Sequence, residues 1–161
     1  MKTCICPGSF DPITMGHLDI IQRAASIFDR VIVAVMVNAK KTSLFTPEER
    51  VELIGRAVKP YSNVEVAYSA DLLSRWAQEL GDCVVVKGLR AISDFESEFQ
   101  MALINRKLNA KLETLFLPTS EEYLYLSSSL VKEVGALQGD ISKFVPAEIL
   151  RDVQNKVSRG N

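Results

Sequence analysis

Short apolar runs alternate with longer amphipathic stretches along almost the whole 161-residue chain. The apolar runs are rich in valine and isoleucine and lack polar alternation, as in strands that are buried on both faces of a parallel sheet. The longer stretches place apolar residues three or four positions apart, which is the spacing of amphipathic helices. The expected strands are residues 2–6, 31–37, 63–68, 83–86 and 112–117, and the expected helices are residues 16–28, 47–58, 71–80, 93–108, 128–136 and 146–157.

Local signals mark the ends of several of these helices. Thr46 is followed by Pro47 and Glu49, which predicts an N-cap, a proline in the first helical position and a capping box. The spacing of Ser93 and Glu96 predicts a second capping box. Gly81 is expected to end the helix over 71–80, as glycine commonly does.

The order of these elements predicts the fold class. Strands that alternate with helices are typical of an α/β fold with a parallel sheet covered on both faces. We therefore expect a single doubly wound, Rossmann-like domain over residues 1–161, with a five-stranded parallel sheet and helices on both faces. The sequence contains no internal repeat, linker or low-complexity segment.

The composition fits one globular domain and argues against a disordered, fibrous, nucleic-acid-binding or membrane-spanning protein. Hydrophobic residues make up 47% of the chain and charged residues 24%, so it is neither disordered nor fibrous. A formal net charge of −1 gives no bulk attraction to nucleic acid. No run approaches the roughly 20 apolar residues that span a bilayer. Pro7 and Gly8 also interrupt the first apolar run, so we expect a cytoplasmic protein without a membrane partner.

The three cysteines are Cys4, Cys6 and Cys83, and this odd count predicts reduced thiols. Cys4 and Cys6 are two positions apart in an expected strand, so their side chains share a face. A metal site would need further ligands, and the single histidine of the chain lies beyond the next loop. We therefore predict that these thiols pack in the core and that the protein has no metal site of its own.

Candidate chemistry gathers in the loops that follow the expected strands, where doubly wound sheets bind their ligands. The first of these loops, PGSFDPITMGH, contains the Ser9 hydroxyl and ends on His17 at the mouth of a helix. Gly8 permits a close approach of ligand and backbone. A neutral imidazole beside a helix N-terminus can donate a hydrogen bond to a phosphate oxygen. The alternative is an exposed histidine that merely begins a helix.

Cations follow two other strands. Lys40 and Lys41 come directly after the second strand, and Lys87 and Arg90 flank a Gly-Leu pair after the fourth. Cations beside a helix N-terminus form an anion site with help from backbone N–H groups. The alternatives are a solvated basic loop and surface charge beside a helix.

Two further features suit a nucleotide. Glu98 could accept hydrogen bonds from a ribose or base, or be an ordinary surface glutamate. The segment SSSLVKE, residues 127–133, places three hydroxyls at an expected helix start, where an N-cap needs only one. The P-loop and G-x-G-x-x-G patterns are absent, and no arrangement for covalent catalysis is evident. These hydrogen-bond donors and cations predict an enzyme that transfers a phosphoryl or nucleotidyl group by positioning its substrates and stabilising their charge.

The segment GSFDPITMGH resembles the G-x-F-D-P-x-T-x-G-H motif of the nucleotidylyltransferase superfamily, whose T/H-x-G-H element is TMGH here. Together with KGLRAISDFESEFQMALINRKL and FLPTSEEYLYLSSSLVKEV, it is similar to the bacterial phosphopantetheine adenylyltransferases over nearly the whole chain. The resemblance implies an enzyme that moves AMP from ATP to 4′-phosphopantetheine. The products would be dephospho-coenzyme A and pyrophosphate, in the penultimate step of coenzyme A biosynthesis.

The resemblance also implies Mg²⁺ carried with ATP, coenzyme A as an inhibitor and a homohexamer. His17 would stabilise the transition state together with Lys41, Arg90 and Ser128. The residues implied for the acceptor substrate are Ser9, Lys41, Asp71, Leu72, Leu73 and Lys87. The residues implied for ATP are Ser9, Phe10, His17, Gly88, Leu89, Arg90, Glu98, Tyr123, Leu124, Tyr125, Leu126, Ser127, Ser128 and Ser129.

Other functions stay open at this point. A cytidylyltransferase or a nicotinamide-mononucleotide adenylyltransferase would share the first motif, although SSSLVKE argues against both. A nucleotide-binding module without catalysis would not need His17, Lys41 and Arg90 together. A scaffolding role would leave the cations at the strand ends unexplained.

Overall fold

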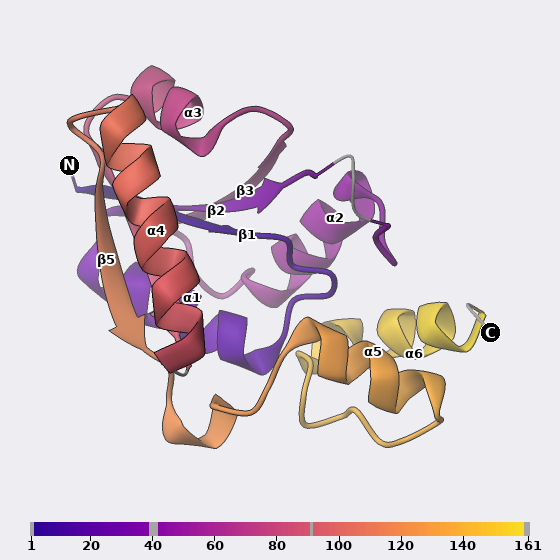
Figure 1. The fold of residues 1–161 in the computed structure, drawn as a ribbon. Helices are drawn as coiled ribbons and strands as arrows, with labels where there is room; N and C mark the ends of the chain where they lie inside the picture. Colours follow the sequence, from indigo (N-terminus) through magenta and orange to yellow (C-terminus); the bar gives the residue numbers. More distant parts are fainter. Residues whose placement is uncertain (1, 39–41, 91, 160–161) are drawn as a thin grey trace.

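Five parallel strands form one sheet in the order β3-β2-β1-β4-β5 (Figure 1). The structure is a computed structural model that describes residues 2–38, 42–90 and 92–159. β1 lies in the centre, and the chain builds outward first through β2 and β3 and then through β4 and β5. The predicted fold class is confirmed. The strands are β1 (Thr3–Gly8), β2 (Arg30–Met36), β3 (Val64–Ser69), β4 (Cys83–Leu89) and β5 (Glu113–Pro118).

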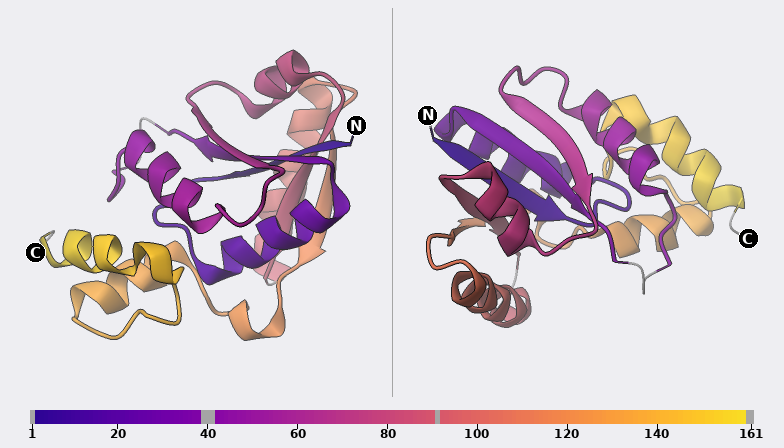
Figure 2. Two further views of the ribbon diagram at one scale, coloured as in Figure 1. Left: turned by 180° about the vertical axis from the view of Figure 1, so that it is seen from behind. Right: turned by 90° about the horizontal axis from the view of Figure 1, so that it is seen from above.

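Helices cover both faces of this sheet (Figure 2). α1 and α2 pack on one face and α3 and α4 on the other, while α5 and α6 pack against each other and α6 lies beside α2. The helices are α1 (Met15–Ile27), α2 (Pro47–Ala57), α3 (Leu73–Leu80), α4 (Ile92–Leu108), α5 (Ser128–Ala136) and α6 (Leu150–Arg159), with short 3₁₀ turns η1 (Glu121–Tyr123) and η2 (Ala147–Ile149). None of the described helices is long and apolar enough to cross a membrane.

Three helix starts differ from the prediction. The helix predicted over 71–80 begins at Leu73, with Leu72 as its N-cap. α4 begins at Ile92, so the N-cap predicted at Ser93 is wrong, and the first-turn acid, Asp94, instead pairs with Arg90 before the helix. The C-terminal helix predicted over 146–157 begins only at Leu150, because Pro146 is the N-cap of a separate 3₁₀ turn. This helix ends at Arg159.

The capping box predicted at Thr46 and the helix end predicted at Gly81 are confirmed. Thr46 caps α2 and forms the capping box with Glu49, with Pro47 as the first helical residue. Gly81 ends α3 with a φ of 84°, in the left-handed region that favours glycine.

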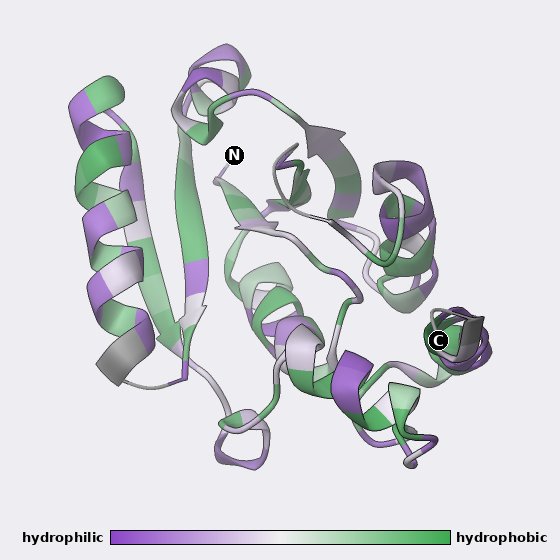
Figure 3. Cartoon of the chain, turned by 45° about the vertical axis from the view of Figure 1, so that its right-hand side comes forward, coloured by the Kyte–Doolittle hydropathy of each residue, from purple (hydrophilic) through white to green (hydrophobic). Residues whose placement is uncertain are grey.

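The core divides into two apolar clusters, one on each face of the sheet. Figure 3 shows the central strands as mainly hydrophobic segments between the helices. Cys4 and Cys6 are both buried in the cluster against α1 and α2, so the prediction that they share a face is confirmed. The hydrogen bond with Cys4 and the burial of the side chain raise the pKa of the Cys6 thiol well above its usual value. Cys6 is therefore a neutral packing residue.

Gly88 allows β4 to pass close to α1. A Cβ atom at this position would lie 2.7 Å from Cγ1 of Ile20 and 3.5 Å from Oγ1 of Thr119. The absence of a side chain thus brings the loop after β4 next to the first turns of α1, where the site residues gather.

Replacing Gly88 is expected to separate these elements. Gly88→Ala should lower the free energy of unfolding by about 1–3 kcal/mol, because Ile20 must move to accept the methyl group. Gly55 in α2 is a matched control, since a Cβ there meets nothing within 4 Å. Gly55→Ala should stabilise by up to about 1 kcal/mol. Urea denaturation at equal protein concentrations measures both changes, and a loss of similar size in the two variants would contradict this role of Gly88.

Candidate active site

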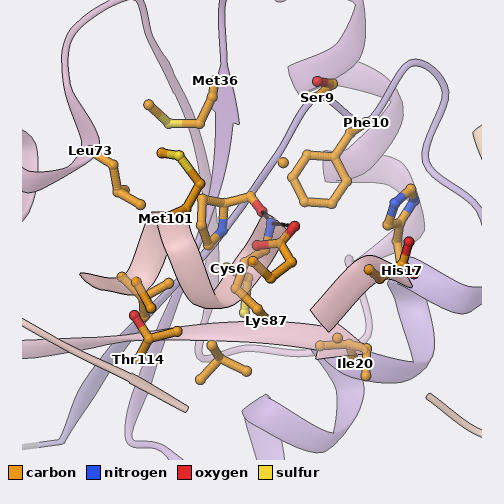
Figure 4. Close-up of a pocket in the computed structure, with 18 of the residues that line it drawn as sticks. Cys6, Ser9, Phe10, His17, Ile20, Met36, Leu73, Lys87, Met101 and Thr114 are labelled. Carbon is orange, nitrogen blue, oxygen red and sulfur yellow. Dashed lines mark hydrogen bonds and ion pairs between the residues drawn. The ribbon is translucent and has the colours of Figure 1, made fainter. Parts of the chain in front are cut away.

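A cavity of about 760 Å³ opens at the carboxyl ends of β1 and β4. The direction of strand order reverses between these two strands, which is where doubly wound sheets bind ligands. Figure 4 shows Ser9, Phe10 and His17 toward one end of this cavity and Met36, Leu73 and Met101 toward the other. A concave, mainly apolar space with a few convergent polar groups is typical of a small-molecule site.

Most of the predicted site residues line this cavity. They come from the segments that follow β1, β3, β4 and β5, from helices α1, α3, α4 and α5, and from β4 itself. β4 extends to Leu89, so Lys87 and Gly88 lie in the strand rather than in the loop predicted after it. The residues brought together are Ser9, Phe10, His17, Asp71, Leu72, Leu73, Lys87, Gly88, Arg90, Glu98, Leu126, Ser127, Ser128 and Ser129.

Five predicted residues are not among those that line it. Lys41 lies outside the described residues. Leu89, Tyr123, Leu124 and Tyr125 are absent from the described lining. Tyr123 belongs to the turn η1, and the exposed ring of Tyr125 lies edge-on to Phe144 at 6.2 Å. Roles for these five stay predictions.

His17 is held by the first turn of α1. The ring atom Nδ1 accepts a hydrogen bond from the backbone N–H of Thr14 at 3.0 Å. The backbone N–H of His17 donates to Oγ1 of Thr14 at 3.3 Å. Thr14 is the N-cap, so the two residues form a capping box in which the imidazole takes the usual place of Glu or Gln. Because Nδ1 accepts, the neutral ring carries its proton on Nε2. That N–H donates to none of the described residues and is available to a ligand.

The surroundings keep this imidazole neutral. Burial, and after it the nearby positive charges of Lys87 and Arg90, together lower the pKa of His17 from 6.5 to about 4. The sequence reasoning assumed a neutral donor here, and the pKa supports it. At neutral pH His17 therefore acts as a hydrogen-bond donor rather than as a cation.

The loop before α1 is held in an unusual conformation. Phe10 has a φ of 49°, in the left-handed region that few non-glycine residues adopt, at a cost of about 1–3 kcal/mol. Its ring is buried and lies edge-on to His17 at 5.0 Å. The buried guanidinium of Arg50 donates to the Ser9 carbonyl at 2.9 Å. These contacts fix the turn that presents Ser9 and His17 to the cavity.

Asp11 also stabilises the loop before α1. Its side chain is buried, and its carboxylate accepts hydrogen bonds of 2.8 Å from the backbone N–H groups of Leu44 and Phe45. Lys132 of α5 lies 3.2 Å from the same carboxylate. Asp11 thus joins the first loop, the segment after β2 and helix α5. The sequence reasoning placed it in the matched motif but gave it no role.

Helix α5 begins at the cavity with its three serines in different roles. Ser127 is the N-cap and accepts from the N–H of Leu130, and Ser128 donates from its hydroxyl to the Pro12 carbonyl at 2.7 Å. Ser129 lies exposed in the first turn. The N-termini of α1 and α5 therefore open onto one space, and each is a favourable place for an anion.

The two predicted cations near the cavity are both tethered. Lys87 donates to the Pro7 carbonyl at 3.3 Å and forms an ion pair with Glu98 at 3.1 Å. Arg90 donates to the Leu126 carbonyl at 2.7 Å and pairs with Asp94 at 3.0 Å. The structure brings these cations and carboxylates together at the mouth of the cavity.

The apolar end of the cavity contains residues that sequence reasoning missed. Met36, Met101 and Thr114 line it, together with Asn105, which is 8% exposed although it lies in a helix that carries apolar residues on several sides. The residues of α4 gave little signal, because its apolar side chains do not form a single stripe. The burial of the Asn105 amide is known only from the structure.

Comparisons with known proteins agree with this geometry. The cytidylyltransferase-like family model matches residues 5–134. A phosphopantetheine adenylyltransferase of Alkaliphilus metalliredigens is 57% identical over 156 residues, covering 97% of this chain and 99% of the relative. One of Caldanaerobacter subterraneus subsp. tengcongensis is 50% identical over 159 residues, covering 99% of both chains.

The chain belongs to the phosphopantetheine adenylyltransferase family. This family membership confirms the resemblance on which the residue roles were based. The segment TMGH contains the N-cap of α1, Thr14, and the first three residues of that helix, including His17.

Solved structures share the fold at much lower identity. A protein described as a nicotinate-nucleotide adenylyltransferase, from Vibrio parahaemolyticus, is 20% identical with a TM-score of 0.72, covering 97% of this chain and 96% of that one. Plasmodium falciparum nicotinic acid mononucleotide adenylyltransferase, complexed with NaAD, is 16% identical with a TM-score of 0.66, covering 100% and 97%. These similarities concern the fold alone.

The protonation of His17 can be tested directly, because the chain has one histidine. In ¹⁵N-histidine spectra, we expect a neutral ring protonated on Nε2 from pH 8 to pH 5. Since the folded pKa is lower than the unfolded one, the unfolded chain binds the extra proton first. The contribution of His17 to stability is therefore complete above about pH 6.5 and is lost as the pH falls toward 4.

A His17→Gln variant provides the control, because Gln can still accept the Thr14 N–H in a capping box. Between pH 6.5 and 4 its free energy of unfolding should fall less steeply than that of the native protein. A single titration near pH 6.5 in the native spectra would show that the pocket does not hold the ring neutral.

Proposed function

We propose that this protein transfers AMP from ATP to 4′-phosphopantetheine, producing dephospho-coenzyme A and pyrophosphate in coenzyme A biosynthesis. The observation that carries the proposal is near full-length identity of 50–57% with phosphopantetheine adenylyltransferases. The cavity supports it independently. It offers donors and cations for phosphates at one end and an apolar space for an extended acceptor at the other.

The proposed reaction is an in-line displacement. A phosphate oxygen of the acceptor forms a bond to the α-phosphorus of ATP while the bond from that phosphorus to the pyrophosphate oxygen breaks. The nucleophile is already anionic near neutral pH, so no general base is needed. Catalysis then depends on positioning and on stabilising charge at the α-phosphate and the leaving pyrophosphate.

The described residues can supply this stabilisation. The Nε2–H of His17 would donate to an α-phosphate oxygen, and the N-termini of α1 and α5 would face the phosphates. Arg90 and Lys87 would provide positive charge, with Lys41 as a further predicted donor. Ser128, bonded to Pro12, would act chiefly by holding α5 against the first loop.

We further propose that Mg²⁺ arrives with the ATP phosphates. The described residues contain no group of three or more His, Cys, Asp or Glu side chains that could hold a metal ion. The ion would neutralise charge on the phosphates, in the way that Mg²⁺ is commonly held by substrate phosphates. Coenzyme A would compete for the same cavity as an inhibitor that resembles the product.

The same resemblance supports a homohexamer in the cytoplasm. α4 presents several exposed apolar side chains, and Figure 3 shows hydrophobic and hydrophilic segments interleaved along it. Phe95 and Phe99 stack at 5.4 Å, and both are more than 40% exposed. Exposed apolar surface of this kind marks an interaction site, and a second copy of the chain is the proposed occupant.

The activity is tested by pyrophosphate release. With Mg·ATP, release should depend on 4′-phosphopantetheine, and the rate constant kcat of His17→Ala should fall about 10²-fold because one preorganised donor is lost. His17→Ala should also lose about 1 kcal/mol of stability, since it removes the acceptor of the capping box. His17→Gln should retain more activity, because its side-chain amide can still donate a hydrogen bond.

The choice of substrates decides between related functions. Release with CTP, or with a nucleotide acceptor in place of 4′-phosphopantetheine, would keep the fold and overturn the proposed substrates. Binding of ATP without turnover on any acceptor would favour a nucleotide-binding module without catalysis.

A further inference from the structure

Both cations of the described cavity lining, Lys87 and Arg90, are paired with carboxylates of one helix. Glu98 Oε1 lies 3.1 Å from Lys87 Nζ. Asp94 Oδ2 lies 3.0 Å from Arg90 Nε, and Asp94 Oδ1 accepts a second hydrogen bond from Arg90 Nη2 at 3.4 Å. Asp94 and Glu98 are four residues apart on α4, so they share one face of that helix. Both line the cavity.

These pairs are more shielded than ordinary surface ion pairs. The side chains of Lys87 and Glu98 are only 22% and 29% exposed, and those of Arg90 and Asp94 are 36% and 31% exposed. Partial burial strengthens the attraction within each pair relative to exposed pairs. A phosphate that approaches Lys87 or Arg90 therefore meets a carboxylate already in place.

The cations have a second anchor that does not depend on these carboxylates. Lys87 donates to the Pro7 carbonyl and Arg90 to the Leu126 carbonyl. If a carboxylate were neutralised, its cation would stay at the cavity and gain an unsatisfied positive charge. The other acid of the described lining, Asp71, is bound to Arg75 and does not compensate for these cations.

We propose that Glu98 and Asp94 are specificity-determining residues that compete with ligand phosphates for Lys87 and Arg90. A small phosphate gains too little from one cation to displace the carboxylate. A ligand that also fills the apolar end of the cavity gains enough, so the carboxylates select large phosphorylated ligands over free phosphate. The choice of such ligands rests on the proposed function, whereas the competition itself does not.

The test uses inorganic phosphate as the probe, with binding to the full chain measured by titration calorimetry at low salt. Glu98→Gln keeps the size of the side chain and removes its charge, and should bind phosphate about threefold to tenfold more tightly than the native protein. Raising the salt concentration should reduce this difference. A variant that merely disturbed the fold would bind more weakly.

Glu113→Gln is the matched control. Glu113 pairs with Arg106 at 3.4 Å, is 54% exposed, starts β5 and is not among the described residues that line the cavity. The Glu113→Gln substitution removes the same charge as Glu98→Gln and should leave phosphate binding unchanged. The double variant Lys87→Met/Glu98→Gln should bind phosphate no more tightly than Lys87→Met alone, because the competed cation is missing.

Unchanged or weaker phosphate binding in Glu98→Gln would overturn the proposal, as would an equal gain in Glu113→Gln. These outcomes are independent of the proposed reaction. Tighter phosphate binding in a protein that releases no pyrophosphate with 4′-phosphopantetheine would retain the competition and reject the proposed function alone.

Discussion

Three segments that are far apart in the sequence meet at the carboxylate of Asp11. It holds the N–H groups of Leu44 and Phe45 and pairs with Lys132 of α5. The first loop carries Ser9 and leads to His17, and α5 begins with the serines at the cavity. A buried carboxylate that loses any of these partners is costly, so the three segments are held in one arrangement. The geometry of the phosphate end of the cavity depends on this contact.

The described positively charged side chains of the site, Lys87 and Arg90, are paired, and its histidine is neutral. His17 is neutral because its Nδ1 serves the helix cap and burial disfavours the imidazolium. Lys87 and Arg90 are fixed by carbonyl groups and balanced by carboxylates of α4. The donors are thus already placed before a ligand arrives, and little reorganisation is needed as charge develops in a transition state.

Much of this arrangement was predictable because it follows from local rules. Continuous apolar strands indicated a parallel sheet, and the topology of such sheets brought the loop residues together. The contribution of Asp11 was not predictable in this way, because all three partners lie more than 30 residues away and two of them, Leu44 and Phe45, donate from the backbone. The pairing of Glu98 with Lys87 was also missed, since a single carboxylate in a helix does not reveal which loop it faces. The start of α4 and the apolar end of the cavity depend on tertiary contacts that no short motif encodes.

The most direct test of this account compares Asp11→Ala with Asp140→Ala by steady-state kinetics, with circular dichroism to show that each variant is folded. Asp140 is exposed, accepts the backbone N–H of Ser142 at 2.8 Å and is not among the described residues that line the cavity, so it reports the loss of a carboxylate away from the site. If Asp11 sets the geometry of the phosphate site, kcat/KM for ATP and for the acceptor should both fall about 10²-fold in the folded Asp11→Ala protein, as expected when reacting groups are displaced. Native kcat and KM in Asp11→Ala, with only a lower unfolding temperature, would show that this carboxylate stabilises the fold without shaping the site.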